Sequence, residues 1–423
     1  MKAAAARLLV EEKAAYPKVA PPCPYVGTCG GCTLQDLAYP DQLALKQQRL
    51  RRAFEPLGPV PEVELVGLED PWRYRNKAEL TFGDDRGRLV LGYHAARSFW
   101  RVVDVDDCLL LPQPAAAVMR DIRQLAQQTG LPPYYPKTHQ GFFRYLLVRA
   151  SHATGRVLLC LMTTSATGGP PPQPGWGGGG QDGVAAARAV VAGIAREVLA
   201  RHPAVSSFYW GLTNQRADIA VPEQLVLLEG DAYLEDRVGP FRLKLHPMSF
   251  LQPSSVQADR IYTRLAQAIG ERPGGIVWDL YCGMGLIAFY LSAQAGTVYA
   301  IDAEPRYVEL AAINAALNGL TNIVFQAGQV EARLKDRRFW LQEAKPDVIV
   351  VDPPRAGLHP QVIPSLLAAR PKQLAYLSCN AQSLVRDLQL LQSGFPRYRI
   401  AAIHAFDMFP QTSHVETLVL LDR

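Results

Sequence analysis

A cysteine at the end of an expected strand is the residue of this chain best placed to carry out chemistry. Cys379 follows the apolar run Gln373–Ser378. In open α/β sheets, ligands bind just beyond the carboxyl ends of the strands. A thiol there can act as a nucleophile, because a thiolate is intrinsically reactive and needs little activation. The alternative is a small buried packing residue, the usual role of a free cysteine.

Two further strings follow expected strands and should reach the same edge of the sheet as Cys379. One is the turn Asp279–Gly285, which reads Asp-Leu-Tyr-Cys-Gly-Met-Gly, and the other is Asp352–Arg355, which reads Asp-Pro-Pro-Arg. Because the carboxyl ends of parallel strands meet at one edge, a cofactor site and a nucleophile should share one crevice.

The glycine turn predicts a nucleotide-like cofactor. Gly283 and Gly285 allow a tight turn and a close approach of the backbone to a ligand at the head of a helix. Asp302 ends the next expected strand, where an acid would bind ribose hydroxyls. The third glycine of a dinucleotide fingerprint is missing, so adenosine without pyrophosphate fits better. This pattern indicates S-adenosylmethionine, and a turn that serves packing alone is the alternative.

The elements that must position these residues are those of an α/β fold. From residue 246 onward, expected strands alternate with helices, which is typical of a parallel sheet. The last two runs, Arg399–Ala405 and Glu416–Leu421, should form an antiparallel pair at the edge of that sheet.

Composition divides the chain into three parts. We expect a tail or short helix at 1–20, a region at 21–245 that holds most of the cysteines and several mixtures of basic and aromatic residues, and an α/β domain at 246–423. Residues 167–183 are almost wholly Gly and Pro, cannot bury a core, and should form a flexible surface loop.

The whole-chain properties are those of an ordinary globular protein with a mildly basic balance. The 423 residues carry a net charge of +5, which permits a polyanionic partner without requiring one. No apolar run is long enough to cross a bilayer, and no signal-peptide core is found near the N-terminus, so we expect a cytoplasmic protein and no membrane partner. Seven cysteines do not suggest a disulfide framework in such a chain. We expect Cys160 and Cys282 to be buried packing residues.

A cysteine cluster lies near the N-terminus in a setting rich in Pro and Gly. Cys23, Cys29 and Cys32 are spaced C-x5-C-x2-C, and Cys108 is the candidate for a fourth ligand. Four thiolates suit either an iron–sulfur cluster or a structural zinc ion, and spacing alone does not decide between them.

Basic and aromatic residues alternate in several places, as in proteins that stack unpaired bases and bind phosphates. They do so at Trp72–Lys77, Arg97–Arg101 and Tyr134–Arg149, and a further basic patch is expected on one helical face at Lys46, Arg49, Arg51 and Arg52. Arg75 and Lys77 are the first candidates for RNA contact. Any one of these patches is equally well explained as a solvated surface.

Taken together, four strings resemble the RNA uracil-C5-methyltransferases, which form 5-methyluridine in ribosomal or transfer RNA with S-adenosylmethionine. They are Asp279–Gly285, Asp352–Leu358, Ser378–Asn380 and Asp407–Glu416. The resemblance implies a Rossmann-like S-adenosylmethionine-dependent methyltransferase domain preceded by a smaller α+β domain with a cysteine cluster.

The resemblance also implies roles for individual residues. Cys379 would be the nucleophile and Glu416 the general base, and Arg355 is a candidate donor to uracil O4. The cofactor would be bound by Gln252, Tyr281, Asp302, Asp352 and Gln329, in addition to the two glycines of the turn. The four cysteines would hold a 4Fe-4S cluster with a structural or RNA-positioning role, since methyl transfer is redox-neutral.

The chemistry explains why these residue types are needed. C5 of uracil is too poor a nucleophile to take a methyl group unaided, and addition of a thiolate to C6 activates it. A base must then remove the C5 proton so that the thiolate can leave. Both ring carbons must be reached, so we expect the base to be extruded from its stack.

Departures from the family pattern leave the substrate open. Pro253 follows Gln252, which is closer to the tRNA-modifying branch, and Ala381 stands where a proline is usual. Too few residues precede Cys23 for the small β-barrel domain of many relatives, so RNA selection should rest on the other domains. The cysteine cluster favours 23S rRNA. The alternatives are T-loop methylation of tRNA and a catalytically dead iron–sulfur RNA-binding protein. We expect a monomer.

Overall fold

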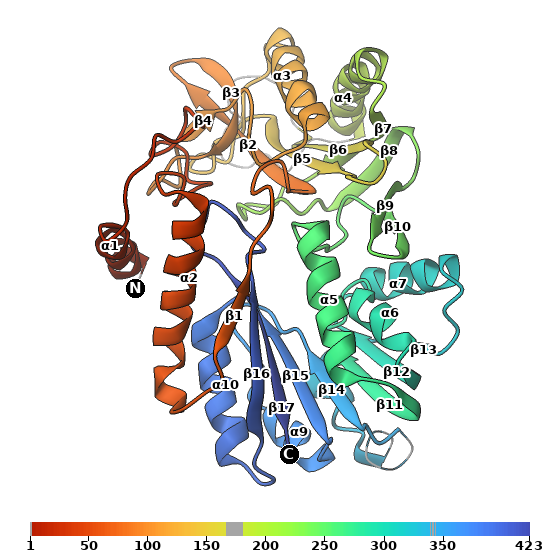
Figure 1. Cartoon of the computed structure of the whole chain (residues 1–423). Helices are drawn as coiled ribbons and strands as arrows, with labels where there is room; N and C mark the ends of the chain where they lie inside the picture. The colour runs from red at the N-terminus through yellow and green to blue at the C-terminus, as the bar shows by residue number, and fades with distance from the viewer. Residues whose placement is uncertain (1, 166–180, 339, 341, 343) are drawn as a thin grey trace.

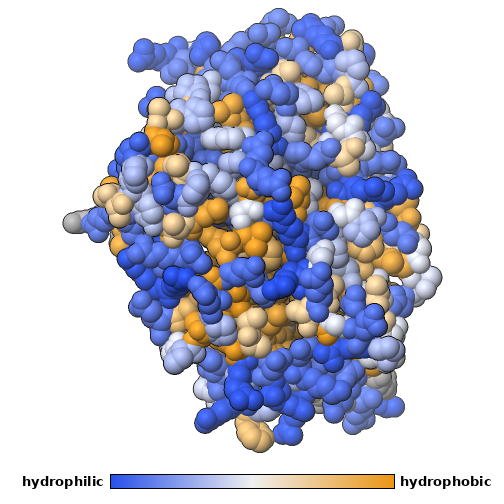
Figure 2. Space-filling view, viewed as in Figure 1, coloured by the Kyte–Doolittle hydropathy of each residue, from blue (hydrophilic) through white to orange (hydrophobic). Residues whose placement is uncertain are grey.

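The computed structural model describes residues 2–165, 181–338, 340, 342 and 344–423. Two sheets form two bodies, one above the other in Figure 1. On the face shown in Figure 2, hydrophobic residues gather in the middle of the molecule, with hydrophilic residues above and below. The N-terminal helix α1 (Lys2–Lys13) lies at the side of the molecule.

The upper body is a seven-stranded, mainly antiparallel sheet. Its order is β4 (Val102–Asp104), β3 (Arg88–His94), β2 (Lys77–Asp85), β5 (Phe143–Ala150), β6 (Val157–Thr163), β7 (Val205–Leu212) and β8 (Gln224–Gly230). Helices α3 (Gln113–Gln128) and α4 (Gln181–Arg201) contribute to the same core as these strands. Strands β6 and β7 pair in parallel, because α4 provides the crossover that parallel strands need.

The lower body is an eight-stranded sheet covered on both faces. Its order is β1 (Val63–Val66), β16 (Arg399–Phe406), β17 (Glu416–Asp422), β15 (Gln373–Ser378), β14 (Val348–Val351), β11 (Arg272–Leu280), β12 (Ala295–Asp302) and β13 (Ile323–Ala327). Strands β11 to β15 run parallel, as the alternating pattern predicted. The Rossmann-like α/β fold is therefore confirmed.

Alternate residues of each strand enter two different cores, as strand geometry requires. Val277 belongs to the core shared with α5 (Ser255–Ile269), α6 (Leu286–Ser292) and α7 (Pro305–Leu317). Its neighbour Trp278 belongs to the core on the other face. The helices of that face are α2 (Tyr39–Phe54), α8 (Val330–Arg333), α9 (Val362–Ala369) and α10 (Ala381–Ser393). A hairpin of β9 (Leu234–Val238) and β10 (Phe241–Leu245) joins the first core, and the short 3₁₀ turn η1 (Glu55–Leu57) follows α2.

The edge of the lower sheet differs from the prediction. β16 and β17 are antiparallel as expected, but β17 lies inside the sheet and β1 pairs in parallel with β16 as the outermost strand. The sequence did not predict β1, because its four residues form a strand only by pairing with β16, which lies more than three hundred positions away. Strand β1 and helix α2, which both come from the region 21–245, therefore belong to the lower body. The predicted domain boundary at residue 245 stays a prediction.

The expected loop at 167–183 falls mostly outside the described residues. Residues 167–180 are not described, and the last three positions form the first turn of α4 instead of a loop. Among the helices of the described part, none is long and apolar enough to cross a membrane.

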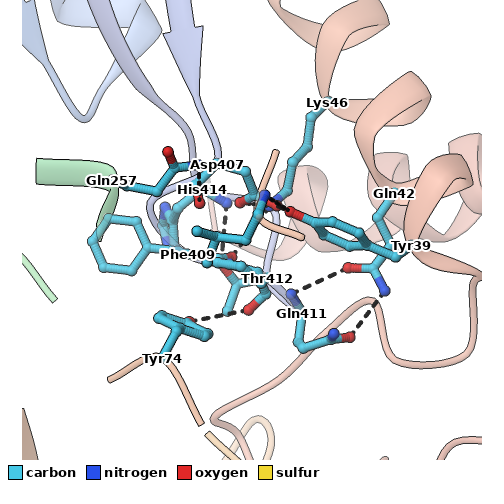
Figure 3. A network of polar contacts seen from close by, with 12 residues as sticks. Tyr39, Gln42, Lys46, Tyr74, Gln257, Asp407, Phe409, Gln411, Thr412 and His414 are labelled. Atoms are coloured by element: carbon cyan, nitrogen blue, oxygen red, sulfur yellow. Dashed lines mark hydrogen bonds and ion pairs between the residues drawn. The ribbon is translucent and has the colours of Figure 1, made fainter. Parts of the chain in front are cut away.

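A buried ion pair ties α2 to the segment between β16 and β17 (Figure 3). Lys46 Nζ lies 2.5 Å from Asp407 Oδ1, and both side chains are fully buried. Tyr39 of the same helix donates a hydrogen bond to Asp407 Oδ2 at 3.0 Å, and Gln42 donates to Gln411 Oε1 at 2.9 Å. The prediction that Lys46 belongs to an exposed basic patch is wrong, because its ammonium is the counter-ion of Asp407.

The rest of that predicted patch is also paired. Arg49 and Arg52 reach Glu12 of α1 at 3.2 and 3.0 Å, and Arg51 reaches Glu62 at 2.9 Å. These arginines fasten neighbouring segments to α2.

We predict that Lys46→Met lowers the free energy of unfolding by about 3–5 kcal/mol, because it leaves the Asp407 carboxylate buried and unpaired. Chemical denaturation measures the change. Arg51→Met removes an exposed ion pair and should cost no more than about 1 kcal/mol. The double variant Lys46→Met, Asp407→Leu should recover much of the loss. Equal costs for Lys46→Met and Arg51→Met would contradict this account.

Candidate active site

The strand ends of the lower sheet surround one cavity of about 770 Å³, which also touches the upper body. It brings together nearly all the residues that the sequence assigned to catalysis or to cofactor binding. Its lining includes Gln252, Tyr281, Gly283, Asp302, Gln329, Asp352, Arg355, Cys379 and Glu416.

The glycine turn has the backbone geometry that its sequence predicted. Tyr281 and Gly283 have positive φ angles of 67° and 52°. The Gly283 N–H donates to Asp302 Oδ2 at 2.8 Å, so this carboxylate ties the turn to the end of β12. Gln329, at the start of α8, lines the same side of the cavity.

Gly285 differs from the prediction, because it is not among the residues that line the cavity. It has a φ of 80° and begins α6. A Cβ on it would lie 2.9 Å from the ring of Phe325 and 3.1 Å from Ala311. Packing of α6 against its neighbours therefore accounts for this glycine.

Gln252 comes to the cavity from the segment before α5. It is buried, and its carbonyl accepts a hydrogen bond from Asn76 Nδ2 at 2.8 Å. The Asn76 N–H also donates to the carbonyl of Pro253 at 2.9 Å. Asn76 directly precedes β2, so this contact anchors the upper body beside the site.

Cys379 is half-buried at the end of β15, with Arg355 beside it. Burial raises the pKa of the Cys379 thiol, and the nearby Glu416 carboxylate raises it further. The Arg355 guanidinium lies within hydrogen-bonding reach of the sulfur and lowers this pKa. Arg355 thus acts on the thiol directly, a contact that the sequence did not suggest.

The cavity contains buried carboxyl groups that repel one another. Burial raises the pKa of Asp352 to about 7, and the negative charge of Asp302 adds to the rise. Burial and then the charge of Asp352 raise the pKa of Glu416 well above its ordinary value, whereas Arg355 lowers it. Glu416 is 2% exposed, and within the described residues its Oε1 has no hydrogen-bond partner. A cationic ligand would relieve this repulsion.

Several lining residues had no signal as cavity residues. Phe250, Tyr307 and Phe409 add aromatic walls, and Lys77 and Glu79 reach in from β2. Phe409 lies within the string Asp407–Glu416, but the sequence did not predict that its side chain lines the cavity. Lys77, predicted to contact RNA, is paired with Glu79 at 2.6 Å.

Arg75 lies between the active-site cavity and a second, smaller one, and lines both. The smaller cavity, of about 30 Å³, is lined by all four cysteines of the predicted cluster: Cys23, Cys29, Cys32 and Cys108. The Gly31 N–H donates to Cys29 Sγ at 3.4 Å, and the Tyr93 hydroxyl donates to Cys108 Sγ at 3.8 Å.

Gln35 and Asp107 line this small cavity together with the four thiols. Burial raises the pKa of Cys32 to about 11. Across the described ranges, no group of three or more His, Cys, Asp or Glu is arranged to hold a metal ion. The shared cavity fits the predicted set of ligands, and metal binding by these cysteines stays a prediction. Cys160 and Cys282 are buried in the core, as expected.

Comparison with known proteins identifies this Rossmann-like chain as an S-adenosylmethionine-dependent RNA methyltransferase. The family model for tRNA (uracil-5-)-methyltransferases matches residues 230–423. An uncharacterized RNA methyltransferase of Nitratidesulfovibrio vulgaris is 36% identical over 95% of this chain and 82% of its own length. One of Caldanaerobacter subterraneus subsp. tengcongensis is 34% identical over 96% of this chain and 85% of its own.

A solved structure extends the likeness to three dimensions. The tRNA (uracil-54, C5)-methyltransferase of Pyrococcus abyssi, in complex with S-adenosyl-L-homocysteine, is 27% identical with a TM-score of 0.71. The match covers 92% of this chain and 85% of the other. The chain belongs to the RNA uracil-5-methyltransferase family.

We predict that Arg355→Ala shifts the pH dependence of Cys379 alkylation to higher pH. Loss of the guanidinium removes the contact that lowers the thiol pKa, so less thiolate is present at a given pH. A shift of one pH unit slows alkylation about tenfold below the pKa. Mass spectrometry of the Cys379 peptide after timed iodoacetamide exposure measures the rate. Arg355→Lys keeps a positive charge and should shift the profile less. An unmoved profile in Arg355→Ala would show that the arginine does not act on the thiol.

Proposed function

We propose that this enzyme methylates C5 of uracil in RNA, with Cys379 as the nucleophile and Glu416 as the general base. The observation that supports this most directly is that one cavity is lined by a thiol, a buried carboxyl group and an arginine beside the thiol. The three residues come from different strand ends, so a packing role for each does not account for their meeting.

The reaction begins at the thiol. The Cys379 thiolate adds to C6 of uracil, forming a sulfur–carbon bond and moving the electron pair of the C5–C6 double bond toward O4. C5 then attacks the methyl group, whose bond to sulfur breaks, and S-adenosylhomocysteine leaves. Glu416 removes the C5 proton, the double bond re-forms, and the thiolate is expelled. Arg355 lowers the thiol pKa for the first step and is the candidate donor to O4.

The residues that would hold S-adenosylmethionine lie along the carboxyl ends of β11, β12, β13 and β14. They are Tyr281, Gly283, Asp302, Gln329 and Asp352, with Gln252 facing them from the segment before α5. A sulfonium cation suits this cavity, because burial raises the pKa values of Asp352 and Glu416 and a nearby positive charge favours their ionised forms. The solved relative with S-adenosyl-L-homocysteine supports this assignment.

Ionisation gives the reaction a pH dependence with a definite sign. Both Cys379 and Glu416 must be deprotonated to act, and burial raises the pKa of each. The free enzyme should therefore gain activity as pH rises toward the alkaline side of neutrality.

For the RNA substrate, we propose ribosomal RNA, 23S rRNA in particular. The support is the four-cysteine arrangement, which resembles that of the ribosomal branch. The likeness to a tRNA (uracil-54, C5)-methyltransferase favours the tRNA T-loop as the second candidate. Mapping 5-methyluridine in rRNA and tRNA of a strain lacking the gene, before and after its return, decides between them.

We predict that Glu416→Gln lowers methylation about 10²–10⁴-fold, because the C5 proton is no longer removed. The RNA should accumulate as a covalent adduct that survives denaturing electrophoresis. Cys379→Ala should form neither product nor adduct, although it binds S-adenosylmethionine as the parent does. RNA containing 5-fluorouridine should trap the parent in the same way, since its C5 carries no removable proton.

Transfer of labelled methyl groups to RNA measures the activity, and calorimetry with S-adenosylmethionine serves as the folding control. Methylation by Cys379→Ala at the parent's rate would contradict the mechanism. Absence of labelled 5-methyluridine in both rRNA and tRNA would favour an RNA-binding protein with a dead site.

The cysteines Cys23, Cys29, Cys32 and Cys108 would hold a 4Fe-4S cluster when it is bound. Its contribution would be structural, because methyl transfer needs no electron. The Gly30 N–H donates to the His94 carbonyl and the Ala96 N–H to the Thr28 carbonyl, so the cysteine segment fastens the loop after β3. A cluster there would hold that loop in place.

We predict that the parent, purified without oxygen, contains about four iron and four sulfide per chain. Cys32→Ser should lose most of both, because it removes a thiolate ligand. Cys160→Ala, which changes a buried cysteine of β6, should keep them. Metal and sulfide analysis measures the content. One zinc ion in place of iron would overturn the cluster assignment.

A further inference from the structure

A third cavity, of about 440 Å³, lies in the upper body and is not part of the active site described above. Its size is within the about 300–1,000 Å³ of small-molecule sites. Its walls are mainly aromatic and proline side chains contributed by the β3–β4 loop and by the segment before β5. They include Phe99, Trp100, Pro132, Pro133, Tyr134 and Tyr135.

The aromatic wall is exposed rather than packed into a core. Phe99 is 68% exposed and Trp100 is 53% exposed, and Tyr135 opposite them is 43% exposed. Lys137 Nζ lies 4.9 Å from the centre of the Trp100 ring, and the two aromatic residues are flanked by the exposed Arg97 and Arg101. Large exposed aromatics are costly on a free surface and suit a planar ligand, and the basic side chains beside them suit its phosphates. The carboxyl groups of Asp84 and Asp218 line the cavity as well.

A buried arginine forms another wall of the cavity. Arg144 is 1% exposed, and its guanidinium lies 4.0 Å from the centre of the Tyr134 ring. Its two terminal nitrogens donate to carbonyls of the segment after β7, at Thr213, Gln215 and Ala217. Its Nε has no hydrogen-bond partner in the described structure. A buried donor without a partner is costly, and Arg144 is one of the residues that line the cavity.

A histidine adds a second unsatisfied polar atom. Nε2 of His94 lies 3.4 Å from Thr81 Oγ1, whereas its buried Nδ1 has no partner within the described residues. His94, Thr81 and Arg144 all line the cavity. Stacking surfaces and hydrogen-bonding edges therefore occur together, which is the combination that recognises a nucleobase.

The cavity is the neighbour of the active site along strand β2. On β2, Glu79 lines the active-site cavity and Thr81 lines the aromatic one. These residues are two positions apart, so they lie on the same face of the strand and about 7 Å from each other. On β3, His94 lines the aromatic cavity beside Thr81, whereas the next residue, Tyr93, lines the active-site cavity from the other face of the strand. A strand of RNA that enters one cavity can thus reach the other within a few nucleotides.

We infer that the aromatic cavity binds a second unstacked base of the RNA strand, close to the uridine to be methylated. This inference rests on the proposed RNA substrate and adds a specificity site to it. The base stacks on Trp100 and Phe99 in the cavity that Arg144 and His94 also line, and the flanking arginines meet phosphates. Holding a second base in this way stabilises an unpaired conformation of the strand and leaves the target uridine free to enter the active site.

The test uses the full chain and a short single-stranded oligouridylate with one 2-aminopurine, moved stepwise away from a central uridine. Trp100→Ala combined with Phe99→Ala should weaken binding roughly 5- to 150-fold, as for the loss of one stacked base. At one position near the central uridine, quenching of 2-aminopurine should be strong with the parent and lost with this variant. Trp100→Tyr keeps a stacking ring and should retain most of both signals.

Kinetics with the RNA that the parent methylates give a second measurement. The double variant should raise KM for RNA and change kcat little, because the second base is held equally before and during the reaction. Phe395→Ala, which removes an aromatic residue that is 80% exposed at the far end of α10, is the matched control and should behave as the parent.

The outcomes separate this inference from the proposed function. Unchanged binding, quenching and KM in the double variant, with methylation intact, would overturn the second base site and leave the function standing. Quenching that depends on Trp100, in a parent that forms no 5-methyluridine, would support the base site and overturn the proposed activity. Failure of the parent to bind or quench any of the oligouridylates, together with unchanged KM in the variant, would overturn the inference.

Discussion

The arrangement of the active site depends on the buried ion pair between Lys46 and Asp407. Asp407 directly follows β16, and the segment that it begins leads to Glu416 at the start of β17. That segment has little regular structure of its own, so its position is determined by side-chain contacts. Tyr39, Gln42 and Lys46 of α2 hold it from one side (Figure 3). The buried charges are expensive to desolvate, and their pairing gives the segment one place to lie.

The same constraint explains how a region far away in sequence contributes to catalysis. Helix α2 packs on the lower sheet, and β1 is the outermost strand of that sheet. The carbonyl of Gln411 accepts hydrogen bonds from the N–H groups of Thr33 and Leu34, which follow the cysteine segment. The cysteine segment in turn fastens the loop after β3. A continuous set of contacts therefore runs from the general-base candidate, through the N-terminal region, to the aromatic cavity. A metal centre at the cysteines would stabilise this path without entering the chemistry.

Electrostatics make the active-site cavity suited to a cation. Asp302, Asp352 and Glu416 line the cavity, Asp279 lies near them, and burial raises the pKa of Asp279, Asp352 and Glu416. Arg355 is the positive group that lowers the pKa of both Cys379 and Glu416. One arginine thus lowers the pKa of both groups that lose a proton in the proposed reaction.

The fold class, the family and most of the active-site lining could be predicted from the residues and their spacing. This was possible because parallel strands place the residues that follow them at one edge, so Asp279–Gly285, Asp352–Arg355 and Cys379 had to meet. Only the tertiary structure decided what depends on non-local contacts. Lys46 looked like a surface charge and is a buried counter-ion, Gly285 serves packing, and β1 joins a sheet built mostly from residues more than two hundred positions away. The aromatic cavity is of the same kind, because its walls come from segments about thirty residues apart that the pairing of β2 with β3 and β5 brings together. The local sequence pattern indicates which face of a helix or strand a side chain lies on. The residue that it contacts across the core depends on how the whole chain packs.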